Sequence, residues 1–213
     1  MTSPGKTDWL VTAGLLALSV IPIAAGTVRV FELGVGTEIT PNNARFFAVP
    51  LPFVLHIFSA TVYCVLGAFQ FNASFRRRKL GWHRVSGKIL VPCGLVVALS
   101  GLWMTLFYPT GIESPEKFDG QILSAIRLLV GTAMAAFLCF GFAAVRRHDI
   151  AHHSAWMIRA YALGLGAGTQ VLTHLPWFIF PSIQGEMART LFMSAGWAIN
   201  LGVAQWLIWR WPH

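Results

Sequence analysis

One long stretch without any Asp, Glu, Lys or Arg decides the fold. It occupies residues 46–75 and reads FFAVPLPFVLHIFSATVYCVLGAFQFNASF. A helix needs about 20 apolar residues to cross a hydrocarbon core of about 30 Å, so this stretch is long enough to span a membrane. The chain carries further long uncharged runs at 9–28, 89–112, 128–145, 160–185 and 190–209.

The composition excludes several classes of protein. Of the 213 residues, 55% are hydrophobic and only 11% are charged, and the mean hydropathy is +0.62. A soluble domain carries roughly 25% charged residues, so this chain is neither a cytosolic globular enzyme nor a disordered tail. The net charge of +8 indicates no nucleic-acid partner, because the basic residues do not lie on a polar domain.

These observations predict an all-α fold, a polytopic six-helix transmembrane bundle that forms a single transmembrane domain over residues 1–213. Pro22 and Pro92 are expected near a helix end or in an early turn. We therefore predict no broken helix pair of the kind that transporters use. The expected spans are about 9–28, 48–74, 86–109, 121–145, 154–177 and 189–210.

The Lys and Arg residues predict the orientation of the bundle. Most acidic residues, Asp119 among them, fall in the alternate loops. Because positive residues favour the cytoplasmic side, we expect both termini and the loop 76–88 to be cytoplasmic, in a bacterial cytoplasmic (inner) membrane. The same loop is expected to hold anionic membrane lipid. Its basic residues are Arg76, Arg77, Arg78, Lys79, Arg84 and Lys88.

Polar and small residues form a stripe on each of two spans. Residues three or four apart share a face of a helix, and polar faces within a membrane turn toward the interior of the bundle. The first stripe consists of His56, Ser59, Tyr63, Gly67 and Gln70. The second consists of His152, Trp156, Arg159, Leu163, Gly166, Gln170 and His174. A ridge of small residues that lets a neighbouring helix approach closely is formed by Ala160, Gly164 and Gly168.

Two histidines are expected at similar depth near the outer membrane face. With a rise of about 1.5 Å per residue, His56 lies about 28 Å and His174 about 30 Å above the inner ends of their spans. Imidazoles on two antiparallel helices could together ligate the iron of haem b, or a copper or zinc ion. Arg127 would then balance the charge of the bound group.

A second layer of histidines is expected near the inner face. His83 and His153 lie at the inner ends of their spans, with Arg159 one to two turns deeper as the cation of that site. The two layers predict a membrane redox or haem-handling protein that passes electrons to a quinone or to a membrane protein complex.

Other interpretations also fit these residues. Taken singly, each histidine fits an interfacial residue that hydrogen-bonds to lipid or backbone. The whole chain fits a non-catalytic accessory or assembly subunit of a larger membrane complex. It also fits a small-solute transporter.

Two stretches carry a family resemblance. The first, residues 55–101, is LHIFSATVYCVLGAFQFNASFRRRKLGWHRVSGKILVPCGLVVALSG; it has an early histidine, G-x-x-QF and then HR-x-x-G after an arginine-rich turn. The second, residues 153–177, is HSAWMIRAYALGLGAGTQVLTHLPW and contains H-x-x-WM-x-R-x-Y-AL. Together they resemble the bacterial domain-of-unknown-function family 2306, a set of predicted multi-pass membrane proteins.

The motif residues are His56, Gly67, Gln70, Phe71, His83, Arg84, Gly87, His153, Trp156, Met157, Arg159 and Tyr161. The resemblance implies a membrane fold and singles out four of these residues, but it implies no established activity. Those four are His56, His83, His153 and Arg159.

Overall fold

The structure, a computed structural model, describes residues 4–109 and 115–210, so both ends of the predicted domain 1–213 lie outside the described residues. All regular elements in the described ranges are helical, which confirms the all-α prediction. The longer helices are α1 (Pro4–Val35), α3 (Pro50–Gln70), α5 (Leu80–Phe107), α6 (Gln121–Arg146), α7 (Ile150–Gly164) and α10 (Glu186–Arg210). The shorter ones are α2 (Ala44–Ala48), α4 (Ala73–Arg78), α8 (Gly166–Thr173), α9 (Leu175–Ile179) and the 3-10 helices η1 (Pro115–Phe118) and η2 (Pro181–Ile183).

Within the described residues, five helices are long and apolar enough to cross a membrane, namely α1, α3, α5, α6 and α10. The segment predicted as one span at 154–177 is not one continuous helix. The chain there is divided into α7, α8 and α9, and a turn at Leu165 separates the first two. Gly164 and Gly166 flank this turn. Glycine is about 1 kcal/mol less favourable than alanine inside a helix, so the local sequence weakens the helix at this point.

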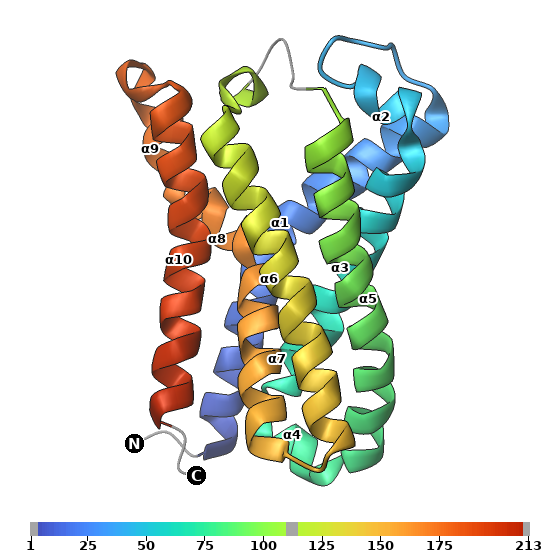
Figure 1. The fold of residues 1–213 in the computed structure, drawn as a ribbon, viewed down its shortest axis with the longest axis vertical. Helices are drawn as coiled ribbons and strands as arrows, with labels where there is room; N and C mark the ends of the chain where they lie inside the picture. Colours follow the sequence, from blue (N-terminus) through green and yellow to red (C-terminus); the bar gives the residue numbers. More distant parts are fainter. Residues whose placement is uncertain (1–3, 110–114, 211–213) are drawn as a thin grey trace.

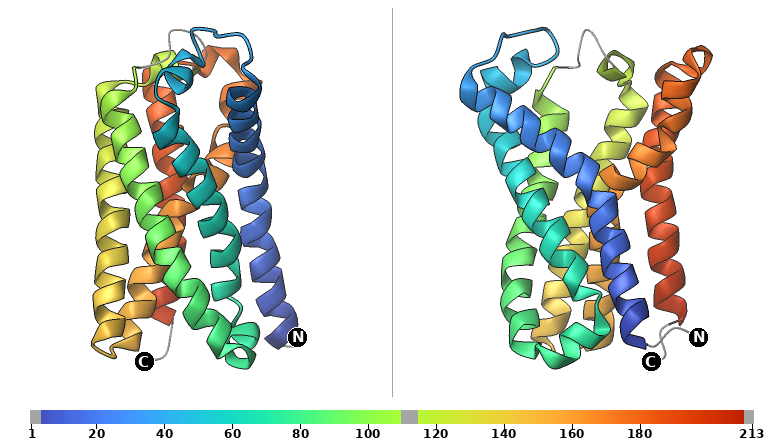
Figure 2. Two further views of the ribbon diagram at one scale, coloured as in Figure 1. Left: turned by 90° about the vertical axis from the view of Figure 1, so that its right-hand side faces the viewer. Right: turned by 180° about the vertical axis from the view of Figure 1, so that it is seen from behind.

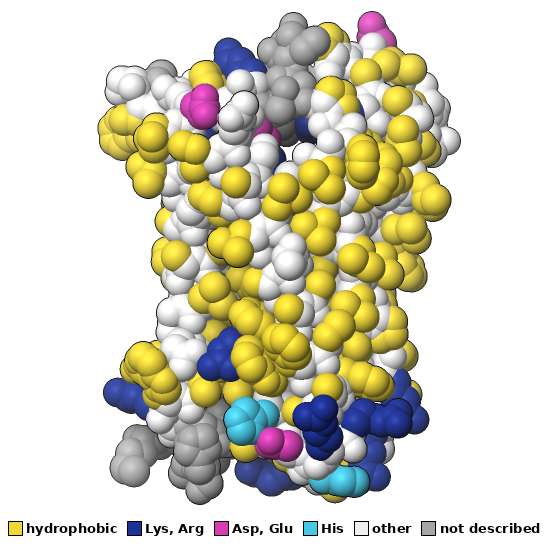
Figure 3. Space-filling model, in the orientation of Figure 1, with side chains coloured by type: hydrophobic (Ala, Val, Ile, Leu, Met, Phe, Trp, Pro, Cys, Tyr) yellow, Lys and Arg dark blue, Asp and Glu magenta, His cyan; other side chains and the backbone are white. Residues whose placement is uncertain are grey.

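The long helices run roughly along the longest axis of the molecule (Figure 1). The start of α1, the end of α10 and α4 lie at one end, which we call the α4 end. The opposite end carries α2 and is called the α2 end. Figure 3 shows Lys and Arg side chains gathered at the α4 end, beyond a wall of hydrophobic side chains. A wall of this kind fits a membrane protein whose sides face lipid and whose ends face water.

The basic segment at 76–88 is mostly helical, so the prediction of a loop there is wrong. α4 ends at Arg78 and α5 begins at Leu80. The side chain of Asn72 accepts the N–H of Phe75 at 2.8 Å and caps α4, which satisfies a donor that the helix itself cannot pair. Much of the basic segment therefore forms the short α4 and the first turns of α5.

A tight turn joins α6 to α7 and places the two helices along one another (Figure 1). His148 adopts a positive φ of 61° in this turn. Asp149 then accepts the backbone N–H of His152 at 3.1 Å and caps α7. Because this N–H stabilises the charged carboxylate, it lowers the pKa of Asp149.

Small residues let α3 and α7 approach closely. The ring of Tyr63 lies against Gly164, where a Cβ would be 2.8 Å from Tyr63 Cε1. The ring of Tyr161 lies against Gly67 in the same way, and its hydroxyl donates to the backbone oxygen of Cys64 at 2.8 Å. Close helix packing of this kind is what small residues permit in membranes. The inward orientation predicted for Tyr63 and Gly67 of the first stripe is confirmed.

Candidate functional site

A cavity of about 500 Å³ lies between α1, α3 and the start of α8, and it extends from α2 to the turn at Leu165. Hydrophobic side chains form most of its wall, among them Ile23, Ile57 and Val97. Small-molecule sites in proteins are mostly apolar cavities of roughly 300–1,000 Å³ with a few polar groups. The cavity is therefore of the size and character that fit a small ligand.

α3 contributes His56 and Cys64 to the wall of this cavity. His56 is the one of the two that carries an imidazole. Its Nδ1 lies 3.0 Å from the hydroxyl oxygen of Ser100 on α5. That hydroxyl donates its own hydrogen to the backbone oxygen of Val96 at 2.5 Å, so it accepts from the Nδ1–H of His56. The neutral ring consequently carries its lone pair on Nε2, and Nε2 has no protein partner among the described residues.

Two hydroxyl groups in the wall donate their hydrogens to backbone oxygens of their own helices. The Oγ of Ser19 donates to the backbone oxygen of Leu15 at 2.9 Å. The Oγ1 of Thr61 donates to the backbone oxygen of Ile57 at 2.8 Å. Each hydroxyl has only one hydrogen, so both oxygens can still accept a hydrogen bond but cannot donate a second one.

Two arginines line the cavity toward its α2 end. Arg29 donates to the carboxylate of Glu32 at 2.9 Å. Arg45 donates to the backbone oxygen of Pro109 at 3.4 Å, and its guanidinium lies 4.7 Å from the centre of the Phe46 ring. This part of the cavity is therefore lined by two guanidinium groups and an aromatic ring.

The interrupted segment between α7 and α8 forms the floor of the cavity, where Gly164 and Leu165 contribute to the lining. The backbone oxygen of Ala162 accepts the Nδ2–H of Asn200 at 3.0 Å. The side-chain oxygen of Asn200 in turn accepts the hydroxyl of Thr169 at 2.7 Å. Non-helical backbone at membrane depth is tolerated where it is buried in protein or lines a cavity, and here both conditions are met.

α1 is bent beside the same cavity (Figure 2). Pro22 lies inside α1 and Pro92 lies inside α5, so the expectation that both lie near a helix end or in an early turn is wrong. Proline has no N–H, so the backbone oxygen of Leu18 loses its donor one turn later. Gly168 of α8 lies directly against that oxygen. The bend of α1 and the break after α7 therefore meet at one wall of the cavity.

His174 lies elsewhere, between α8 and α9, and is only 7% exposed. Its Nδ1 donates to the backbone oxygen of Gln170 at 2.8 Å, and its ring lies beside Trp177 and Phe192. Its Nε2 is buried without a partner among the described residues. No hydrogen bond or ring contact in the described residues joins it to His56, and the cavity lined by His56 does not include it.

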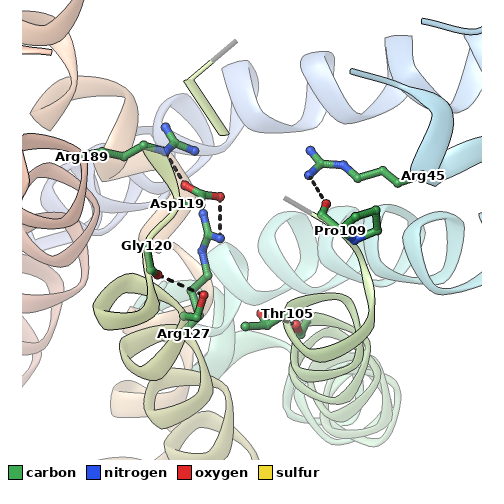
Figure 4. Close-up of polar contacts among 9 residues, drawn as sticks. Arg45, Thr105, Pro109, Asp119, Gly120, Arg127 and Arg189 are labelled. Atoms are coloured by element: carbon green, nitrogen blue, oxygen red, sulfur yellow. Dashed lines mark hydrogen bonds and ion pairs between the residues drawn. The ribbon is translucent and has the colours of Figure 1, made fainter. Parts of the chain in front are cut away.

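Arg127, the predicted countercharge of an outer site, binds a carboxylate of the protein itself. Asp119 accepts from Arg127 at 2.8 Å and from Arg189 of α10 through its other oxygen (Figure 4). Only 5% of the Asp119 side chain is exposed. Through its buried carboxylate, Asp119 ties the residue that follows η1 to α6 and α10 at the α2 end.

The residues predicted for the inner site are only partly brought together. His83 lies near enough to His153 for their charges to interact, and the Nδ1 of His83 is buried without a partner among the described residues. His153 uses Nδ1 to donate to the backbone oxygen of Gly141 at 2.9 Å. Arg159 instead donates to Oε1 of Gln205 on α10, at 2.8 Å and 3.2 Å.

Within residues 4–109 and 115–210, no group of three or more His, Cys, Asp or Glu side chains could hold a metal ion. The metal site predicted at His56 and His174 therefore gains no support from the geometry. Sequence reasoning missed the acceptors at Ser19 and Thr61, because each lies singly in an apolar run. Pro22 lies inside the long uncharged run 9–28. It is the feature of the sequence that could have indicated a bend, and hence a cavity, beside Ser19.

The helices and the cavity together define a membrane protein with several apolar helices. The family described as "Predicted membrane protein (DUF2306)" matches residues 53–208, and the chain belongs to this family. The resemblance noted in the sequence motifs is thus confirmed. No match was found among curated proteins, and none was found among solved structures.

Proposed function

We propose that the protein binds a small lipophilic molecule within the membrane, in the cavity lined by His56. The observation that carries this proposal is the Nε2 atom of His56, which has no protein partner among the described residues and belongs to the wall of a mainly apolar cavity. Ionisable side chains inside a membrane are costly and tend to be functional. A cavity with few, well-placed polar groups is the usual form of a ligand site.

The interrupted helices favour a carrier or permease over an accessory subunit. Membrane transporters place their substrates beside discontinuous helices, whose unwound backbone can change shape without breaking a whole helix. Here the bend at Pro22 and the break at Leu165 both border the cavity. We therefore propose a small-solute carrier for a lipophilic molecule that occupies the half of the bundle nearer the α2 end. Anionic lipid at the basic α4 end and a membrane protein complex are further proposed partners.

The geometry supports the redox or haem-handling hypothesis less well than it supports the binding of a small lipophilic molecule. A haem held by two histidines needs both imidazoles on opposite sides of one iron. His56 lines the cavity, whereas His174 lies between α8 and α9 with its own set of neighbours. A quinone fits the proposal better than haem does, because it is lipophilic and carries only two polar oxygens.

The reactivity of introduced thiols tests the proposal directly. We would replace Cys64, Cys93 and Cys139 by Ala, introduce Ala60→Cys in the cavity wall, and treat the purified protein with methyl methanethiolsulfonate. Ala60 lines the cavity, so we expect its thiol to react. The matched control is Ala98→Cys, at a position only 3% exposed in the packed core, which we expect to stay unmodified.

Equal rates at the two positions would contradict the proposal, because the cavity would then be no more accessible than the core. A third variant, Phe58→Cys, replaces a side chain of α3 that is 69% exposed and does not line the cavity. It reports the rate at which the reagent reaches the protein from the surrounding detergent. A small lipophilic probe should slow modification of the Ala60→Cys thiol and leave the Phe58→Cys thiol unaffected.

A further inference from the structure

Arg159 is held in place by contacts with two other helices. Its Nε and Nη2 atoms both donate to Oε1 of Gln205 on α10, at 3.2 Å and 2.8 Å. Its guanidinium also lies 4.8 Å from the centre of the Trp156 ring on its own helix, α7. Trp156 in turn stacks on Phe137 of α6, with ring centroids 5.3 Å apart and an interplanar angle of 28°. The guanidinium is therefore fixed on both sides, unlike a long side chain that only extends toward water.

One edge of this guanidinium remains available for a ligand. An arginine carries five N–H donors, and the hydrogen bonds to Gln205 use two of them. The two donors of Nη1 and the second donor of Nη2 have no acceptor among the described residues. They form an edge that can bind two oxygens of a phosphate side by side. No carboxylate of the described residues lies within ion-pair distance of Arg159.

Arg159 lies at the depth of a membrane interface. α7 and α10 pack along one another, and the start of α7 and the end of α10 both lie at the α4 end (Figure 1). Gln205 precedes Arg210, the last residue of α10, by about 7.5 Å along the helix axis. At this level of α10, Trp206 and Trp209 are 48% and 78% exposed. Exposed tryptophans of this kind are typical of the interface where lipid headgroups lie.

An exposed apolar stripe on α10 continues from Gln205 away from the α4 end. Ala198, Gly202 and Gln205 share one face of the helix, since residues three or four apart lie above one another. Both small residues are exposed, and a Cβ on Gly202 would meet nothing within 4 Å. The neighbouring Val203 is 53% exposed. An acyl chain can therefore lie along α10 while the phosphate of the same lipid contacts Arg159.

We propose that Arg159 binds the phosphate of an anionic glycerophospholipid whose acyl chain lies along α10. The site is separate from the cavity lined by His56, because neither Arg159 nor Gln205 belongs to the wall of that cavity. It gives the anionic lipid proposed as a partner a defined place between α7 and α10, apart from the basic residues of α4. Arg210 at the same end of α10 disfavours a headgroup that carries an ammonium group, since like charges repel.

Lipid binding to the purified protein in detergent tests the proposal, with native mass spectrometry as the measurement. The two probes are palmitoyl-oleoyl phosphatidylglycerol and palmitoyl-oleoyl phosphatidylcholine. They share both acyl chains and the phosphate, and they differ in the charge of the headgroup. Because only the choline headgroup brings a positive charge to the basic end, we expect the first phosphatidylglycerol molecule to bind on the order of tenfold more tightly than phosphatidylcholine.

Three variants locate the site. Arg159→Gln keeps a polar side chain but loses the charge, so we expect the affinity for phosphatidylglycerol to fall on the order of tenfold. Gln205→Leu keeps the charge and removes the acceptor that fixes it, so we expect a loss of about threefold. Arg78→Gln is the matched control, because Arg78 is an exposed cation of α4 at the same end. It changes the net charge equally and should leave the affinity within about twofold.

Several outcomes would overturn the proposal. Equal affinities of the two lipids in the wild type would do so. An equal loss in Arg78→Gln and Arg159→Gln would also do so, because the attraction would then belong to the basic end as a whole. Displacement of phosphatidylglycerol by millimolar inorganic phosphate would assign the site to a free anion instead of a lipid. Should Arg159→Gln fail to fold, Gln205→Leu and the preference of the wild type still test the site.

The lipid site and the ligand cavity can fail separately. The reaction of the Ala60→Cys thiol reports on the cavity and does not involve Arg159. A reactive Ala60→Cys thiol without any preference for phosphatidylglycerol would overturn this inference alone. A lipid preference that depends on Arg159, together with an unreactive Ala60→Cys thiol, would overturn the proposed function and support the lipid site.

Discussion

The backbone oxygen of Leu18 faces Gly168 so closely that a Cβ on Gly168 would lie 2.3 Å from it. Pro22 supplies no N–H to this oxygen, since proline lacks the donor. The contact between α1 and α8 thus exists because one helix lacks a hydrogen bond and the other lacks a side chain. It joins the bend of α1 to the interrupted segment that follows α7.

Substitution of Gly168 by Ala should destabilise the protein. The new methyl group would meet the backbone of α1, which cannot rotate away as a side chain can. Overpacking of this kind typically costs about 1–3 kcal/mol. Thermal unfolding of the purified variant measures the effect. Gly202→Ala is the matched control, because a Cβ there meets nothing within 4 Å, and an unfolding temperature lowered equally in both variants would contradict the account.

Substitution of Pro22 by Ala should restore the missing donor. The new N–H is expected to bind the oxygen of Leu18, straighten α1 and reduce the cavity. The Ala60→Cys thiol should then react several-fold more slowly with methyl methanethiolsulfonate. Pro92→Ala serves as the control, because Pro92 lies inside α5 but outside the cavity lining. An unchanged rate in Pro22→Ala would show that the bend does not shape the cavity.

Substitution of Asp119 by Asn should strongly destabilise the α2 end. It would leave Arg127 and Arg189 facing one another without the carboxylate between them, and breaking a buried ion pair from one side costs about 3–5 kcal/mol. Arg189→Gln should cost more than Arg127→Gln, because their side chains are 11% and 25% exposed. The exposed Asp149→Asn is the control and should change the free energy of unfolding little. A similar cost for both aspartates would contradict the account.

Substitution of Asn200 by Ala should destabilise the break between α7 and α8. It removes both the donor to the Ala162 oxygen and the acceptor of the Thr169 hydroxyl, at a cost of about 1–3 kcal/mol. Thr169→Val removes only the second of these bonds and should cost less. Chemical unfolding monitored by tryptophan fluorescence compares the two. Equal costs would mean that the Ala162 oxygen does not depend on Asn200.

The absorption spectrum of protein purified from haem-replete cells tests the haem hypothesis separately. A shared haem would give a Soret band that is lost in both His56→Ala and His174→Ala. The cavity account predicts no such joint dependence, because the two imidazoles lie in different surroundings. A stoichiometric haem lost in both variants would contradict it.

The polar stripes could be predicted from the sequence because helical spacing fixes which residues share a face. Tyr63 and Gly67 are buried as expected, and the ridge residue Gly164 receives the ring of Tyr63. The depth of His174 could not be predicted in the same way. The estimate assumed an unbroken helix, whereas the turn at Leu165 redirects the chain before His174 is reached.

The bend of α1 and the Asp119 group were missed for physical reasons that the sequence does not display. α1 continues to Val35, past Arg29 and Glu32, which pair on its surface. The charges that bound the uncharged run 9–28 therefore do not end the helix. Asp119 lies in a segment that reads as an ordinary polar loop. Its burial depends on Arg189, which is distant in the sequence and comes from α10.

A crystal structure of the protein soaked with 4-bromophenol would test the central claim most directly, because the anomalous signal of bromine marks the position of the ring. The account predicts one strong peak in the cavity between α1 and α3, beside His56. The peak should be absent in Ala60→Trp, which fills the cavity. Bromine found only on the lipid-facing surfaces, in both proteins alike, would contradict the existence of a ligand site at His56.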